Sequence, residues 1–260
     1  MEPRFHTTQL QAGLGLIAET RALLVLYESG LSVSALTERA LASGRFPLIS
    51  ARRLLNIVSE CFAPRYLRSA GTAAALKKLA PAMTNAEFNQ LLLIHTARAN
   101  AVLADFLTEE YWPRYVAGHD TISIDDARRF VTNSVREGRS QTPWSETTIK
   151  RVASYLLSCC ADYDLLSNNT RGPRGIKPLR LSPGAAAYLA YDLRFQGLGD
   201  NQILNHPDWR IFGLDAQDVR EQLKMLSLAG HLILQSAAEV IHIGWTYKTM
   251  DELTDVLTRH

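Results

Sequence analysis

A long apolar run, a signal sequence and an even number of cysteines are all missing from this sequence of 260 residues. Its three cysteines are an odd number at no metal-binding spacing, which indicates free thiols in a reducing compartment. The first residues lack the basic region and apolar stretch of a signal peptide, and no run reaches the roughly 20 apolar residues of a membrane span. We therefore expect a cytoplasmic protein that does not associate with membranes.

The motifs of familiar enzyme mechanisms are missing as well. The sequence contains no Gly-x-x-x-x-Gly-Lys loop, no Gly-x-Gly-x-x-Gly, no His-Glu-x-x-His and no Cys-x-x-Cys. Its seven histidines are scattered, and His95 lies on an apolar helix face, which is typical of a core histidine. We therefore expect no enzyme activity, no catalytic residue, no cofactor, no metal site and no small-molecule substrate.

Positive charge is present but unevenly distributed, although the formal net charge is only +2. Residues 1–82 carry 10 basic and 5 acidic side chains, and residues 128–180 carry 10 and 4. Residues 83–127 and 181–260 are acidic, with 2 basic side chains against 7 acidic ones and 6 against 10. Phosphates attract Lys and Arg and repel carboxylates, so a nucleic acid would favour the two basic segments. The alternative is that these segments form unrelated surfaces whose net charges differ in sign without a functional reason.

Helical periodicity dominates the N-terminal half. Apolar spacing predicts helices within residues 14–27, 34–43 and 51–62, and a longer helix that follows a capping box of Thr84 and Glu87. We expect Pro64 to end the third helix and Pro113 to end the long one, because proline cannot donate the backbone hydrogen bond of a helix interior.

In the second half, an amphipathic helix twice precedes a short, strand-like hairpin. The first pair comprises residues 145–167 and 171–181, and the second comprises residues 215–229 and 232–247. Leu179 and Leu181 alternate with Arg180 as in an edge strand, and Ile241, Ile243, Trp245 and Tyr247 share one face of the second hairpin. Helix followed by hairpin is the order of a winged-helix unit, whose helix enters a DNA groove.

We therefore predict a mostly α protein with small β-hairpins, divided into two domains. Residues 1–118 form an N-terminal all-helical domain, which is helix-turn-helix-like. Residues 119–260 form a C-terminal helical domain that is winged-helix-like. The boundary lies near Gly118, where the charge changes from acidic to basic.

The first helix-hairpin pair carries the positive charge that DNA binding requires. Phosphate is favoured at a helix N-terminus, where hydroxyl groups donate to its oxygens and cations neutralise it. The candidate DNA-binding residues at this helix start are Arg139, Ser145, Thr147, Lys150 and Arg151, and those in the following loop are Arg171, Arg174 and Lys177. The alternative is a solvated basic loop. The second pair is no candidate, because Asp215, Asp218 and Glu221 at its helix start would repel phosphate.

A rival DNA-binding surface lies within residues 34–62, which read as helix, turn and helix. Arg52 and Arg53 follow Ser50 at the start of the second helix. The connection, residues 43–50, is longer than the three or four residues usual for this motif. Arg52 and Arg53 are therefore either a second contact surface or part of a solvated face.

Several short segments are similar to those of a known family. They are Arg21-x-Leu23-Leu24, Pro143-Trp144-Ser145, Leu198-Gly199 with Trp209, the segment from Gly230 to Tyr247, and Met250-Asp251-Glu252-Leu253. On these segments the chain resembles the BrxA family, accessory proteins of the BREX bacteriophage-defence systems. The resemblance implies a mostly helical, cytoplasmic, non-catalytic protein, likened to the NusB antitermination fold and associated with double-stranded DNA. It assigns no binding residue.

Together these features predict an accessory protein of a phage-defence system that binds duplex DNA mainly through phosphate contacts. Two alternatives stay open. One is an RNA-binding, NusB-like regulator that uses the N-terminal helices. The other is an adaptor that joins other BREX proteins through its apolar C-terminal hairpin and acidic tail. The expected partners are double-stranded DNA and other BREX defence proteins.

Overall fold

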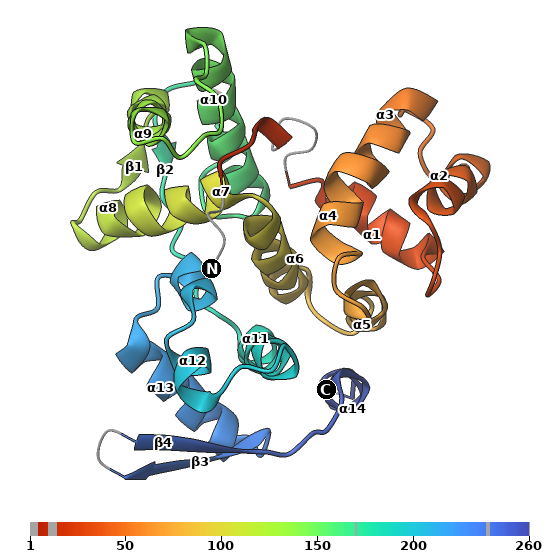
Figure 1. Ribbon diagram of the computed structural model, residues 1–260, viewed down its shortest axis with the longest axis vertical. Helices are drawn as coiled ribbons and strands as arrows, with labels where there is room; N and C mark the ends of the chain where they lie inside the picture. Colours follow the sequence, from red (N-terminus) through yellow and green to blue (C-terminus); the bar gives the residue numbers. More distant parts are fainter. Residues whose placement is uncertain (1–4, 10–14, 170, 238–239, 260) are drawn as a thin grey trace. The chain divides into compact units, whose positions relative to one another are not determined.

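A computed structural model describes residues 5–9, 15–169, 171–237 and 240–259 (Figure 1). Most of these residues are helical, and the described strands form two antiparallel sheets of two strands each. This confirms the predicted class, a mostly α protein with little β-structure. Among the described residues, no single helix is long and apolar enough to cross a membrane.

The chain divides into two compact units, each built from two segments: Met1–Ala73 with Leu93–Leu179, and Ala74–Leu92 with Arg180–His260. Residues 119–179 thus lie in the first unit, although they follow the boundary expected near Gly118. As separately folding domains, residues 1–118 and 119–260 stay a prediction.

The elements follow the chain in this order. The first unit contains α1 (Ile17–Leu26), α2 (Val33–Ala42), α3 (Ala51–Ile57), α4 (Ala63–Tyr66), α7 (Ala101–Phe106), α8 (Trp112–Val116), β1 (Thr121–Ile122), α9 (Ile124–Arg136), α10 (Glu146–Asp162) and β2 (Arg174–Gly175). The second contains α11 (Pro183–Phe195), α12 (Asp200–Leu204), a 3₁₀ helix (Pro207–Phe212), α13 (Ala216–Leu228), β3 (Leu232–Ala237), β4 (Val240–Trp245) and α14 (Met250–Leu257). Helices α5 (Thr72–Leu79) and α6 (Asn85–Ala99) span the junctions between segments.

Two groups of helices build the first unit. Helix α2 packs on α1 and α3, and Leu23, Leu36 and Leu54 from these helices are fully buried. Helix α9 packs against α10 (Figure 1) and contacts α7, where the rings of Phe106 and Phe130 meet edge to face with centroids 5.3 Å apart. These contacts hold the starts of α3 and α10, which carry candidate residues, in defined positions.

The two prolines expected to end helices lie inside them, so that prediction was wrong. Helix α3 continues through a π-helical turn, Val58–Phe62, into α4, and α7 continues through a second, Leu107–Tyr111, into α8. Pro64 and Pro113 are each the second residue of the α-helical segment after the π-helical turn, where a missing amide hydrogen is tolerated. The long helix instead breaks at Asn100, and its two parts are bent by 113°.

The prediction of a hairpin at residues 171–181 was wrong, because the strand in this segment pairs with a distant part of the chain. The only described strand of this segment, β2, pairs with β1 from before α9, with Thr121 opposite Gly175. A single antiparallel bridge joins Leu166 to Ile176. The loop after α10 is therefore anchored to a distant segment and does not form a free wing.

The edge strand predicted at residues 179–181 is absent from this described segment. The buried side chain of Gln90 donates to the Arg180 carbonyl at 3.0 Å and accepts from the Ser182 amide at 2.8 Å. Because one side-chain amide satisfies both backbone groups, this segment needs no strand partner.

The second helix-hairpin pair forms as predicted. Asp215 caps α13, and β3 pairs with β4 from Leu232 opposite Trp245 onward. Ile241 and Ile243 are buried on one face, as the alternation indicated. The outer edge of β4 is covered in part, because the Ile243 amide donates to the Asp200 carboxylate at 2.9 Å. Assignment of this arrangement as a winged helix stays a prediction.

Candidate nucleic-acid interface

The segment joining α2 to α3 and the first turn of α3 together present three exposed arginines. The Ser50 hydroxyl caps α3 by accepting from the Arg53 amide at 3.3 Å. The side chains of Arg52 and Arg53 in the first turn are exposed, and so is that of Arg45 in the connection. None of these three side chains has an ion-pair partner in the part of the chain that the structure describes. All three charges are available to an anion.

The start of α10 is capped by Ser145. The Ser145 hydroxyl accepts from the Thr148 amide at 3.2 Å and lies 3.0 Å from the Thr148 hydroxyl oxygen. Ser145 therefore already satisfies one free amide of the helix end, which leaves it less able to bind phosphate than the sequence suggested. Thr147, one position before Thr148, is exposed.

Two cations follow on the first turns of α10. Lys150 pairs with Glu146 at 2.7 Å, but these side chains are 50% and 80% exposed. An ion pair so exposed contributes little to stability, so Lys150 can exchange Glu146 for a phosphate oxygen. Arg151 is exposed too. Glu146 in the first turn works against this surface, because its carboxylate opposes the partial positive charge of the helix end.

Arg139 is surrounded by carboxylates. Its guanidinium contacts Glu109 at 2.7 Å, Glu137 at 2.9 Å and Asp105 at 3.3 Å. The hydrogen bond to Glu109, together with the three negative charges, raises the pKa of Arg139 despite partial burial. A phosphate would have to displace these partners, so Arg139 holds the fold together at this position.

Of the three candidate cations in the loop after α10, one is hydrogen-bonded within the first unit and two are accessible. Arg174 donates to the Leu157 carbonyl at 3.1 Å, and so fastens β2 to the last turns of α10. Lys177 lies 3.8 Å from Asp164, in a loose and exposed pair. Arg171 is exposed. The recurrence of Arg and Lys in this loop therefore overstates the charge available to a ligand.

A comparison with protein families gives a match to BrxA over residues 5–192. The chain belongs to the BrxA family. Membership implies a protein associated with a BREX defence system. The family match ends before Leu198, so the later segments that suggested the resemblance lie outside it. No curated protein matches the sequence.

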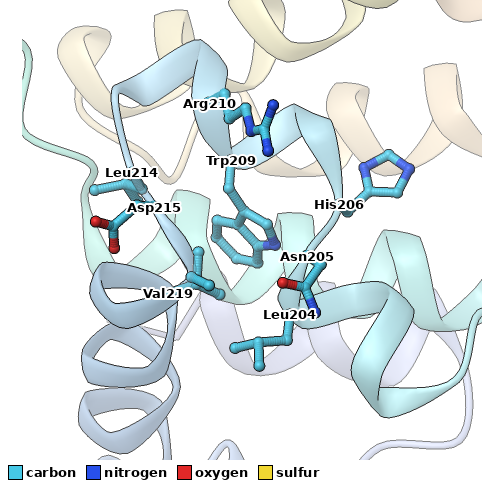
Figure 2. A pocket seen from close by; sticks show the side chains of 9 residues that line it. Leu204, Asn205, His206, Trp209, Arg210, Leu214, Asp215 and Val219 are labelled. Atoms are coloured by element: carbon cyan, nitrogen blue, oxygen red, sulfur yellow. The ribbon is translucent and has the colours of Figure 1, made fainter.

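This BrxA-family chain has a small hollow at the start of α13, in the second unit (Figure 2). Its volume is about 80 Å³, and the ring of Trp209 points into it between Leu204 and Val219. The indole nitrogen already donates to the Ile203 carbonyl at 2.8 Å, and Asp215 accepts from two amides of α13. Because these polar groups are engaged within the unit, we assign no ligand to the hollow.

Near Arg52 and Arg53 of this BrxA-family chain, the structure exposes two further residues that the sequence analysis did not name as candidates. Arg45 lies in the same basic segment as Arg52 and Arg53, and its position in the connection was a usable signal. Leu48 is 98% exposed in the same connection. Its exposure could not be predicted from the sequence, because leucine is usually buried. We call the surface formed by Arg45, Leu48, Arg52 and Arg53 the α2–α3 surface.

Proposed function

We propose that this BREX-associated protein binds duplex DNA in the cytoplasm, mainly through phosphates and without catalysing a reaction. The observation that supports this most directly is the α2–α3 surface, whose Arg45, Arg52 and Arg53 are exposed and have no ion-pair partner among the described residues. Guanidinium groups match the geometry of phosphate oxygens, and each neutralised phosphate releases counterions. A paired cation gains less, because its original partner loses an interaction.

A second group of contacts is proposed around the start of α10. Lys150, Arg151 and Arg171 would reach phosphates there, with Thr147 as a hydroxyl donor. Lys177 would add to them after leaving its loose pair with Asp164. The proposal does not use Arg139 or Arg174, whose guanidinium groups are bound within the first unit.

A salt titration of binding to a random-sequence duplex tests this function. If about six cations contact phosphate, the slope of log K against log salt should be roughly −5, since each contact contributes about −0.9. Replacing Arg52 and Arg53 with alanine should make that slope about 2 smaller in magnitude and weaken binding to all sequences alike.

The matched control is the double variant Arg194→Ala/Arg210→Ala, which removes two exposed arginines from the second unit. It should bind DNA as the wild type does. Absence of binding at low salt would overturn the proposal. Equal losses in the two double variants would move the binding surface away from α3.

The adaptor function has one observation in its favour. Met225 and Leu228 on α13 and Ile233 on β3 are 60%, 83% and 60% exposed, which suits contact with another BREX protein. Co-purification of BREX proteins after nuclease treatment, lost when Met225 and Leu228 become serine, would support it. Tighter binding of structured RNA than of duplex DNA in the same titration would favour the RNA-binding alternative instead.

A further inference from the structure

Leu48 is the most exposed large apolar side chain among the described residues. It is 98% exposed, whereas Leu228 and Val116, which follow it, are 83% and 82% exposed. Single exposed leucines are common, so exposure alone means little. The position of this leucine, at the apex of the connection between α2 and α3, makes it informative.

The connection holds Leu48 outward. The Ile49 amide donates to the Phe46 carbonyl at 3.1 Å and closes a turn with Pro47 and Leu48 at its centre. Phe46, only 9% exposed, anchors one end of this turn, and Ser50 anchors the other by capping α3. Proline restricts the backbone just before Leu48. The leucine therefore has little freedom to fold back onto the protein.

Arginines lie on both sides of this leucine in the chain. Arg45 precedes it by three residues, and Arg52 and Arg53 follow it by four and five. All three are exposed without an ion-pair partner among the described residues. Glu19 on α1 lines the groove beside the turn, but it is not at the apex. A partner for this apex must accept one apolar side chain between groups of negative charge.

Duplex DNA has this arrangement: the apolar faces of stacked bases lie between two rows of phosphates. We infer that Leu48 is a wedge that enters a base step from the minor groove, while Arg45, Arg52 and Arg53 hold the flanking phosphates. This inference rests on the proposed function. A wedge of this kind partly unstacks the step and kinks the duplex toward the major groove. Phosphate contacts offset the cost of unstacking, so the protein would bend DNA as it binds.

An extended apolar patch for a protein partner fits the surface less well. The neighbouring exposed leucines, Leu41 and Leu55, are 47% and 45% exposed and belong to α2 and α3, not to the turn. A protein-binding patch normally covers several hundred Å² of contiguous apolar surface. One leucine at an apex, with arginines before and after it, is closer to the single apolar wedge of architectural DNA-binding proteins.

Bending and binding can be measured separately on one duplex of about 25 base pairs, labelled with a donor and an acceptor dye at its ends. Anisotropy gives the affinity, and energy transfer gives the end-to-end distance. The full-length wild type is compared with Leu48→Ala, which should lose the wedge, and with Leu48→Phe, which should keep it. Leu228→Ala is the matched control, because Leu228 is also highly exposed but lies on α13.

The wild type, Leu48→Phe and Leu228→Ala should raise energy transfer on binding, whereas Leu48→Ala should bind without raising it. A two-base mismatch, whose unstacking costs less, should bind the wild type on the order of tenfold more tightly than an intact duplex. Leu48→Ala should lose that preference.

Two results would overturn the wedge alone: wild type that binds without bending, or Leu48→Ala that bends DNA as the wild type does. A loss of self-association in Leu48→Ala, with bending intact, would reassign the leucine to a protein contact. If the wild type binds no duplex at low salt, the proposed function and the wedge both fail.

Discussion

One guanidinium nitrogen of Arg139 donates to both carboxylate oxygens of Glu109, at 2.7 and 2.8 Å. The same region anchors residues near the N-terminus, since the His6 amide donates to the Arg139 carbonyl at 2.7 Å. The His6 ring nitrogen Nε2 lies 2.8 Å from an Asp105 carboxylate oxygen, and Asp105 also contacts Arg139. A residue from a basic stretch of sequence thus joins three separate segments of the first unit.

Replacing Arg139 with alanine should lower the free energy of unfolding and leave DNA affinity unchanged. The side chains in this cluster are partly exposed, so a loss of about 1–2 kcal/mol is expected. Urea denaturation measures the stability, and the salt titration measures the affinity. Arg52→Ala should lower DNA affinity and leave the free energy of unfolding unchanged, because the Arg52 side chain is exposed and unpaired within the described residues. A loss of affinity in a stable Arg139→Ala protein would contradict this assignment.

Stability should fall in mild acid partly through Asp105. Burial alone would raise the pKa of this carboxyl, but the hydrogen bond with His6 and the charges of His6 and Arg139 lower it overall. A carboxyl whose pKa is lower in the folded state stabilises the protein above its unfolded pKa of about 4. That contribution disappears as the pH falls through the lowered value.

The change Asp105→Asn should therefore reduce the difference in unfolding free energy between pH 6 and pH 3. Because the side chain is 35% exposed, solvent screening limits the effect to at most about 1 kcal/mol. Urea titrations at the two pH values test it. Asp125→Asn, at a carboxylate that is 78% exposed, is the control and should keep the wild-type difference. An unchanged difference in Asp105→Asn would show that the carboxyl does not contribute.

The change Gly15→Ala should destabilise the first unit. A Cβ atom at Gly15 would lie 2.6 Å from the Cβ atom of Asp162 on α10, closer than two non-bonded carbon atoms approach in folded proteins. It would also disturb the hydrogen bond of 2.9 Å from the Gly15 amide to the Asp162 carboxylate. Strain of this kind costs about 1–3 kcal/mol.

Thermal unfolding of the Gly15→Ala variant measures this loss, and Gly199→Ala is the control. At Gly199 the nearest atom to an added Cβ is 3.8 Å away, which is ordinary contact. Gly199→Ala should unfold at nearly the wild-type temperature. Equal midpoints for the two variants would mean that the segment before α1 moves away at little cost.

The cysteines should be unreactive in the folded protein. Cys61, Cys159 and Cys160 are buried, and burial raises the pKa of Cys159 to about 12 and that of Cys160 well above its ordinary value. Thiolate is the reactive form, so little of it exists at neutral pH. A chromogenic thiol reagent should react slowly with the native protein and with three equivalents after denaturation. One rapid equivalent in native buffer would contradict this and point to an accessible thiol.

Local hydrogen bonds explain why several helix starts could be predicted from the sequence. Ser145 caps α10 through an amide three residues away, and Thr84 and Glu87 form the predicted capping box at the start of α6. Such caps depend on neighbouring residues alone. The alternating face of β4 is equally local, because the buried positions Ile241 and Ile243 follow from the two-residue period of a strand.

Long-range contacts decided which basic residues remain available to a ligand. Arg139 and Arg52 look alike in the sequence, but the fold brings Glu109, 30 positions away, onto Arg139 and no described carboxylate onto Arg52. Gln90, 90 positions before Arg180, replaced a predicted strand, and the packing of Phe46 turned Leu48 outward. The sequence by itself determined where several helices start, which residues cap them and that two segments are basic, because these features depend on nearby residues. Only the tertiary structure decided which charges are free, because an ion pair depends on which distant carboxylate lies within about 3 Å.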